Sequence, residues 1–152
     1  GEGGAALEGL VSLLRERGYL SHALEIGEPA PVWMSDLPDY RFQPSAAGHS
    51  LARIDDMFDT LLERESDPRA AETGNYVAAI GDDEQFAVAV ALIARELGFP
   101  SRVVVGTRLA SPDTGVSVCD AGVCRAQDVS AWTEVQGGDG RWVPIDVTPQ
   151  YA

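Results

Sequence analysis

The chain has 152 residues, of which 45% are hydrophobic, and its 24 Asp and Glu against 11 Arg and Lys give a formal charge of −13 at pH 7. This length is enough for one domain with a substantial apolar core. The negative charge repels phosphate groups, which argues against nucleic acid and against direct binding to anionic lipid headgroups. We therefore expect residues 1–152 to form a single domain that recognises neither.

The N-terminal part is predicted to contain two helices separated by a long irregular segment. Residues 5–18 predict an amphipathic helix, and residues 50–63 predict a second one with Ser50 as its N-cap. Residues 26–48 are rich in proline and show no periodicity, so we expect a surface segment anchored by its aromatic side chains. Those side chains are Trp33, Tyr40 and Phe42.

A central helix is predicted over residues 83–97. Its apolar residues recur three and four positions apart: Phe86, Val90, Ile93 and Leu97. Alanines widen this stripe and allow close packing, and Gly98 ends the helix. The helix begins at a cluster of three acidic residues, Asp82, Asp83 and Glu84, and either aspartate is suited to cap its free N–H groups.

The C-terminal part is predicted to form strands. Three β-rich runs follow the helix: residues 102–109, 129–136 and 141–147. The glycines of residues 137–140 predict a hairpin turn between the last two runs. This order of elements indicates an α+β fold in which the central helix packs on an antiparallel sheet. Residues 1–80 then form a helical and proline-rich lead-in, and residues 81–152 form the core helix and sheet.

The two cysteines, Cys119 and Cys124, are separated by four residues that include Gly122. A disulfide that closes this short loop would stabilise the fold by about 2 kcal/mol, and we favour it over two free thiols. A zinc site is a weaker alternative, because His22 and His49 lie far away in the sequence. A disulfide would indicate an oxidising, extracytoplasmic location.

Three stretches resemble a known family. They are GDDEQFAVAVALIARELGFPSRVVVG at residues 81–106, SAWTEV at 130–135 and RWVPIDVTP at 141–149. Together they resemble the bacterial transglutaminase-like domain, whose fold is papain-like. In that family the helix begins G-x-C-x-x-F-A, one strand carries H-A-W-x-E-V and the next carries W-V-x-x-D-x-T. The segments GYLSHAL and GHSLARIDDMF are more loosely similar to the lead-in of such domains in actinobacterial multi-pass membrane proteins.

The chemistry of that family uses a Cys at the helix N-terminus, a His on the facing strand and an Asp that orients the His. On these motifs Asp83 occupies the Cys position, Ser130 the His position and Asp146 the Asp position. The resemblance therefore implies the fold without its nucleophile and its base. Loss of both groups costs on the order of 10⁶ in turnover, so we expect no catalytic residue.

Four interpretations of the acidic helix start stay open. The favoured one is a helix cap; the second is a Ca²⁺ or Mg²⁺ site formed with Asp146 and Glu134. The third is an Asp83 nucleophile or general base paired with Asp146, and the fourth is a polar pocket that binds a peptide or glycan without chemistry. The candidate binding residues are Asp83, Glu84, Ser130, Trp132, Glu134 and Asp146. No metal or other cofactor is expected.

Three strand residues have structural interpretations. Trp132 and Trp142 lie on adjacent predicted strands, where they could stack on each other or form the wall of a cleft, but burial in the core is favoured. Glu134 is expected to be a solvated or ion-paired strand residue.

The resemblance implies a domain on the extracytoplasmic side of the cell membrane, and the chain opens on Gly rather than Met, so we expect a domain excised from a membrane protein. Membrane contact would then come only from flanking segments. The expected function is a catalytically inactive binding or scaffolding module for a peptide, a protein or a cell-wall component. The alternatives are a hydrolase with altered chemistry that uses Asp83 and Asp146, and a structural spacer domain.

Overall fold

The structure is a computed structural model that describes residues 2–20, 28–30, 50–111 and 117–149. Its helices are α1 (Glu2–Arg17), α2 (Leu51–Glu65), α3 (Pro68–Thr73) and α4 (Asp83–Glu96), with a 3₁₀ turn, η2, at Ala126–Asp128. Its strands are β1 (Gly18–Leu20), β2 (Ala79–Gly81), β3 (Ser101–Thr107), β4 (Val129–Gln136) and β5 (Trp142–Ile145). The expected α+β architecture is confirmed, with an antiparallel sheet of order β3-β4-β5.

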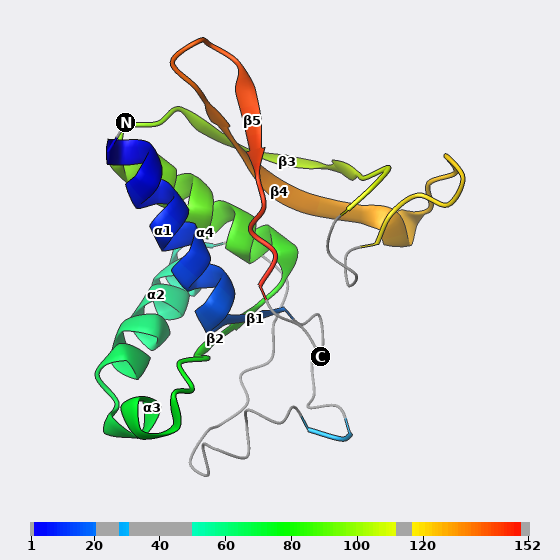
Figure 1. Ribbon diagram of the computed structural model, residues 1–152. Helices are drawn as coiled ribbons and strands as arrows, with labels where there is room; N and C mark the ends of the chain where they lie inside the picture. The colour runs from blue at the N-terminus through cyan, green and yellow to red at the C-terminus, as the bar shows by residue number, and fades with distance from the viewer. Residues whose placement is uncertain (1, 21–27, 31–49, 112–116, 150–152) are drawn as a thin grey trace.

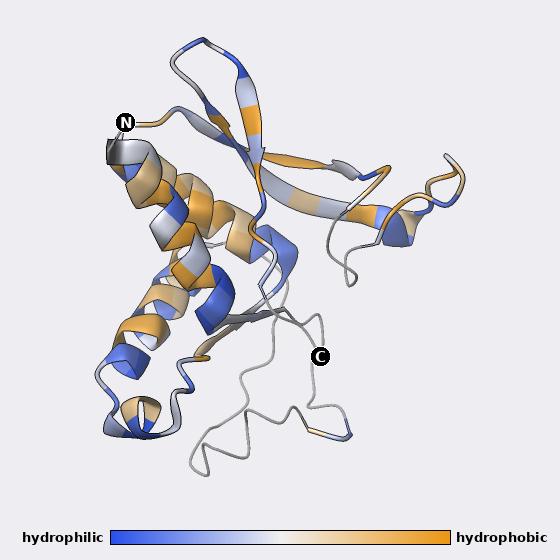
Figure 2. Ribbon diagram, in the orientation of Figure 1, coloured by the Kyte–Doolittle hydropathy of each residue, from blue (hydrophilic) through white to orange (hydrophobic). Residues whose placement is uncertain are grey.

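Helix α4 lies between the sheet and the helices α1 and α2 (Figure 1). Phe86 and Val90 on its core face are fully buried. The core residues contributed by α1 and α2 are Leu7, Val11, Leu14, Ile54 and Met57. Figure 2 shows the hydrophobic character that runs along α4 and through the middle of β3. The stripe predicted for the central helix is therefore the centre of the core.

Both ends of α4 follow from local sequence. The carboxylate of Asp82 accepts a hydrogen bond from the backbone N of Gln85 at 2.8 Å, and the side-chain oxygen of Gln85 accepts one from the backbone N of Asp82 at 3.1 Å. This reciprocal pair is a capping box, which assigns the cap to Asp82. Leu97 is the C-cap and Gly98 follows it with a φ of +84°, so the helix ends one residue earlier than predicted.

Two hydroxyl groups connect the sheet to α4. Thr133 Oγ1 donates to the carbonyl oxygen of Ala87 at 2.6 Å, and Ser101 Oγ donates to that of Ala91 at 2.7 Å. The residues of β4 that face the helix are small or of medium size: Ala131, Thr133 and Val135. Small side chains on both surfaces let the helix and the strand approach closely.

The sheet has the predicted strands in the predicted order, and two of them are shorter than expected. The run 102–109 becomes Ser101–Thr107, and the run 141–147 becomes Trp142–Ile145. The hairpin turn between β4 and β5 is confirmed, because the backbone N of Gly137 donates to the carbonyl oxygen of Arg141 at 2.9 Å. The strand pairing places Arg102 of β3 and Pro144 of β5 on either side of Glu134.

A short parallel pair of strands, β1 and β2, was not predicted from the sequence. It lies just before the start of α4 (Figure 1), and its backbone at Gly18 packs against the ring of Phe86. A Cβ atom on Gly18 would come within 2.5 Å of that ring, and one on Gly81 within 2.9 Å of the side chain of Met57. Glycine at both positions allows this close approach of the backbone to the core.

The N-terminal helices differ from prediction in three respects. Helix α1 begins at Glu2, three residues earlier than expected. Ser50 occupies the N-cap position of α2, but its side chain makes no capping hydrogen bond. Helix α3 was missed: Asp67 caps it by accepting from the backbone N of Arg69 at 2.9 Å, and Gly74 ends it with a φ of +70°.

Several sequence-based expectations fall outside the described residues. They concern residues 26–48 apart from 28–30, the aromatic residues Trp33, Tyr40 and Phe42, and both histidines. Within the described ranges, no helix combines the length and the apolar character needed to cross a bilayer.

Candidate functional site

Asp83, the first residue of α4, connects the helix to the sheet. Its Oδ2 accepts a hydrogen bond from the backbone N of Ala131 at 2.5 Å. Strand β5 pairs with β4 only between Thr133 and Gln136, so Ala131 lies beyond the end of that pairing. The Asp83 carboxylate therefore supplies a hydrogen-bond acceptor to the backbone N–H of β4 at a position where β5 no longer pairs with that strand.

Ser130 immediately precedes this contact, so the structure brings the helix start next to the Ser130 position of β4. The Ser130 Oγ is buried, and no hydrogen-bond partner for it exists in the described part of the chain. Glu84 lies in the first turn of α4 and its side chain is partly buried. Asp83 and Glu84 thus lie at the start of α4, and Ser130 precedes the strand residue to which Asp83 is bonded.

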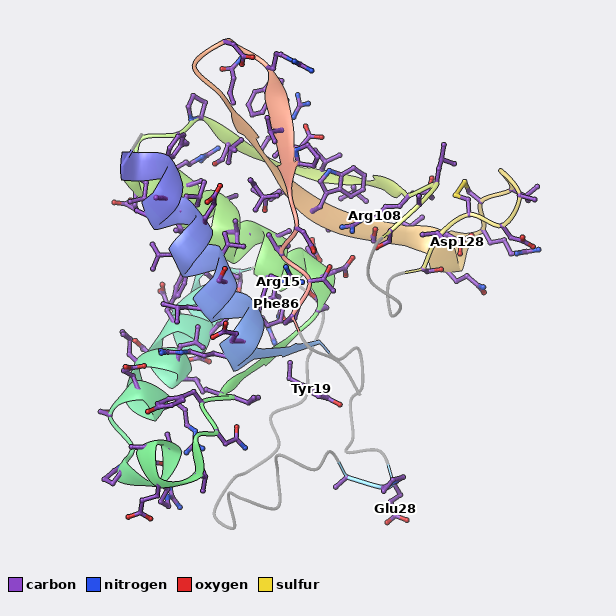
Figure 3. The ribbon with its side chains drawn as sticks, viewed as in Figure 1. Arg15, Tyr19, Glu28, Phe86, Arg108 and Asp128 are labelled. Atoms are coloured by element: carbon purple, nitrogen blue, oxygen red, sulfur yellow. A yellow bond between two sulfur atoms is a disulfide. The ribbon has the colours of Figure 1, made fainter. Side chains whose placement is uncertain are left out.

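Asp146 follows β5 and is held by two elements. Its Oδ1 accepts from the backbone N of Thr148 at 3.0 Å, and its Oδ2 lies 3.4 Å from the guanidinium of Arg15 in α1. Arg15, which is labelled in Figure 3, also donates through Nε to the carbonyl oxygen of Thr148 at 2.9 Å. The contact of Arg15 with this segment could not be predicted from the sequence, because Arg15 lies 133 positions from Thr148 and no local pattern connects the two.

The outer face of the sheet, opposite α4, carries a cluster of charged and aromatic side chains. Arg102 donates two hydrogen bonds to Glu134 Oε2, at 2.8 and 2.6 Å, and its guanidinium lies 4.2 Å from the ring centre of Trp142. The ion-paired alternative for Glu134 is therefore the observed one. Trp142 is 36% exposed, so the expectation that it packs in the core is wrong.

Trp132 also lies on this outer face rather than in the core, which corrects the favoured prediction. The strand register places it opposite Val104 and places Trp142 opposite Gln136, so the two indoles are not cross-strand partners. The indole of Trp132 covers Gly106, because a Cβ there would lie 3.0 Å from the ring. The Arg108 guanidinium lies 5.4 Å from the ring centre of Trp132.

A surface pocket of about 410 Å³ opens beside Trp132, within the usual size range of ligand sites. Its lining residues are Thr107, Arg108, Leu109, Ala110, Trp132, Glu134, Pro144, Ile145 and Asp146. The alternative that Trp132 forms the wall of a cleft is thus the observed one. Of the six candidate binding residues, the pocket contains Trp132, Glu134 and Asp146. Asp83 and Glu84 lie instead at the start of α4, and Ser130 lies on β4.

The connection between β3 and β4 contains the predicted disulfide, which is confirmed between Cys119 and Cys124. Next to it, the Asp128 carboxylate accepts hydrogen bonds from Ser117 Oγ at 2.6 Å and from the backbone N of Arg125 at 2.7 Å. The hydrogen bond from Ser117, followed by the one from Arg125, lowers the pKa of Asp128 below its ordinary value of 3.8.

The acidic residues proposed as metal ligands each have other partners. Asp83 is bonded to the Ala131 amide, Glu134 to Arg102 and Asp146 to Arg15. Among the residues that the structure describes, no group of three or more His, Cys, Asp and Glu side chains is arranged to hold a metal ion.

Comparison with protein families assigns the fold. The model of the transglutaminase-like superfamily matches residues 56–147, which is more than half of the chain. The chain belongs to the transglutaminase-like superfamily. Comparisons with curated proteins and with solved structures gave no match.

The transglutaminase-like match contains Asp83, Ser130 and Asp146, together with the whole sheet. It does not include α1. Arg15, which pairs with Asp146, is therefore contributed by a helix outside the transglutaminase-like match.

Proposed function

We propose that this chain is a catalytically inactive transglutaminase-like domain that acts as a binding or scaffolding module. The observation that supports this proposal best is the hydrogen bond from the Ala131 amide to Asp83. In the resemblance described above, Asp83 occupies the position of the nucleophilic Cys. A carboxylate bonded to the strand backbone holds the helix and sheet together, and it cannot form the thioester on which cysteine-type acyl transfer depends.

The other two aligned positions support the same proposal. Ser130 offers a hydroxyl where the family has a histidine, and a hydroxyl is no general base near neutral pH. Asp146 has the family's residue type, but Arg15 now pairs with its carboxylate. All three positions therefore have structural partners or lack the chemistry of acyl transfer.

Binding is supported by the pocket beside Trp132. It combines an indole, apolar walls and three charged side chains on a sheet face that α4 does not cover. Pockets of this kind commonly recognise small ligands or peptide segments. We propose a peptide, a protein or a cell-wall component as the partner.

The location proposed for this module is the extracytoplasmic side of a membrane, in a protein anchored by segments outside this chain. The Cys119–Cys124 disulfide supports it, because disulfides persist mainly in oxidising compartments.

Turnover assays test the inactive state. The wild type and the Asp83→Asn variant would be assayed for incorporation of a fluorescent primary amine into a glutamine peptide and for cleavage of peptide substrates. We expect no turnover above buffer from either protein. Turnover by the wild type that disappears in Asp83→Asn would overturn the proposal in favour of a hydrolase with altered chemistry.

A binding assay tests the second half of the proposal with purified peptidoglycan sacculi and a tryptic digest of casein as probes. Leu109 is 76% exposed in the wall of the pocket, and Leu62 is 69% exposed on α2, so both tolerate substitution. Binding of either probe that Leu109→Asp weakens and Leu62→Asp preserves is the expected result. If neither probe binds, the structural spacer becomes the better description.

A further inference from the structure

The pocket contains a cation that lacks a carboxylate partner. Arg108 is partly buried in the pocket wall, and its guanidinium contacts the face of Trp132. In the described part of the chain it forms no ion pair.

The two carboxylates of the pocket are neutralised by other arginines. Glu134 accepts both hydrogen bonds of Arg102 on Oε2 and lies 3.4 Å from the indole nitrogen of Trp132 through Oε1. Asp146 pairs with Arg15. The remaining charge of the pocket is therefore that of Arg108, and the pocket favours an anionic ligand although the chain as a whole is acidic.

The shape of the anion follows from the donor. A guanidinium presents two parallel N–H groups that match the two oxygens of a carboxylate. The rest of the wall is mostly apolar, formed by Leu109, Ala110, Pro144 and Ile145 around the indole of Trp132. A ligand with a carboxylate at one end and an apolar side chain beside it fits both features.

A glycan fits this pocket less well. Sugars are held by many hydrogen bonds to their hydroxyl groups, and the carboxylates that could accept them are occupied by Arg102 and Arg15. An aromatic face alone does not replace those bonds. The observations therefore favour a peptide end over a carbohydrate.

We propose that the pocket binds the C-terminal carboxylate of a peptide that ends in an apolar residue. Arg108 receives the carboxylate, and the last side chain packs between Trp132 and Leu109. This inference rests on the proposed binding function and specifies the ligand class of that same pocket. Capture of a chain-terminal carboxylate is an established mode of peptide recognition.

A panel of N-acetylated tripeptides ending in Ala, Val, Leu or Phe, each prepared as the free acid and as the amide, tests the inference. Dissociation constants would be measured by NMR from the shifts of the Trp132 indole and the Leu109 amide. At least one acid should bind, and its amide should bind about 10-fold to 100-fold more weakly, because a charge-assisted pair is lost. The acid-to-amide ratio is the affinity for the acid divided by the affinity for its amide. In Arg108→Gln this ratio should fall to near one.

Arg95→Gln is the matched control, because Arg95 is an exposed arginine in the last turn of α4, away from the pocket. It should keep the wild-type acid-to-amide ratio. If Arg108→Gln does not fold, Arg108→Lys replaces it. Lysine keeps the positive charge but lacks the planar guanidinium that pairs with both carboxylate oxygens, so the acid-to-amide ratio should fall but stay above one.

The outcomes separate this inference from the proposed function. If acids and amides bind equally with shifts at Trp132, the carboxylate inference is overturned and the binding module stands. The inference is also overturned if the acid preference survives in Arg108→Gln, or if no peptide of the panel binds. Turnover by the wild type would overturn the proposed inactive state whatever the peptides do.

Discussion

Substitution of Asp83 by alanine tests whether this carboxylate stabilises the fold. Ala131 is 5% exposed, so removing the acceptor of its N–H leaves a buried donor without a partner. Such a group costs about 1–3 kcal/mol. For a chain of this length that corresponds to a fall in Tm of roughly 3–10 °C. Asp83→Asn keeps an acceptor oxygen and loses mainly the charge at the helix N-terminus, so it should cost about 0.3–1 kcal/mol.

The assay is urea and thermal unfolding followed by circular dichroism. Asp55→Ala, a charge loss at an exposed site of α2, is the control and should change the free energy of unfolding by no more than about 0.5 kcal/mol. If Asp83→Ala is as stable as the wild type, or more stable, the reasoning is refuted. Residues kept at a cost in stability are typical of functional sites, and that result would reopen the hydrolase alternative.

Two further predictions concern stability. Hydrogen bonds from the side chain and the backbone of Arg69 lower the pKa of Asp67 from 3.8 to about 2. Because the folded chain binds this proton less readily than the unfolded chain, the ionised carboxylate stabilises the fold. This contribution to the free energy of unfolding is complete above about pH 4 and is lost as the pH falls toward 2. Unfolding by urea between pH 2 and pH 6 should show this loss in the wild type and a flatter profile in Asp67→Asn. Gly18→Ala should destabilise the fold by about 1–3 kcal/mol, because the new Cβ overlaps the ring of Phe86. Gly9→Ala, in an open part of α1, is the control and should be neutral or stabilise the fold by up to about 1 kcal/mol. Equal effects of the two variants in thermal melts would contradict the packing argument.

The elements with strong periodicity could be predicted from the sequence. Helix α4 has a continuous apolar stripe and a capping residue at its start, so its position was correct to within one residue. The β4–β5 hairpin has a glycine-rich turn between two β-rich runs. In contrast, β1 and β2 have three residues each, too few for a periodic pattern, and helix α3 is only six residues long.

The orientation of Trp132 shows where pattern alone failed. Alternation along β4 places Ala131, Thr133 and Val135 on one face and Trp132 with Glu134 on the other. Large apolar side chains usually face the core, so the indole was predicted to lie there. The alanine-rich surface of α4 packs too close for an indole, because Thr133 Oγ1 reaches the carbonyl oxygen of Ala87 at 2.6 Å. The small face is therefore the buried one.

The candidate site was only partly predictable for a related reason. The motifs identified Asp83, Ser130 and Asp146 in the sequence, but the partners that define their chemistry come from distant segments. Ala131 lies 48 positions from Asp83, and Arg15 belongs to the first helix. Such contacts depend on the packed fold and leave no local signal.

Asp83 and Ser130 suit each other, whereas replacing only one of them by the catalytic residue of the family would not give a working thiol and base. A Cys at position 83 alone would be a weak acceptor for the Ala131 amide and would have no base beside it. A His at position 130 alone would lie next to the Asp83 carboxylate, which would favour the charged imidazolium and remove its capacity as a base. Only Asp83→Cys together with Ser130→His restores a thiol and a neutral base, so thiol-dependent turnover should appear in the double variant and in neither single one. Turnover in Asp83→Cys alone would show that another group near the helix start accepts the proton.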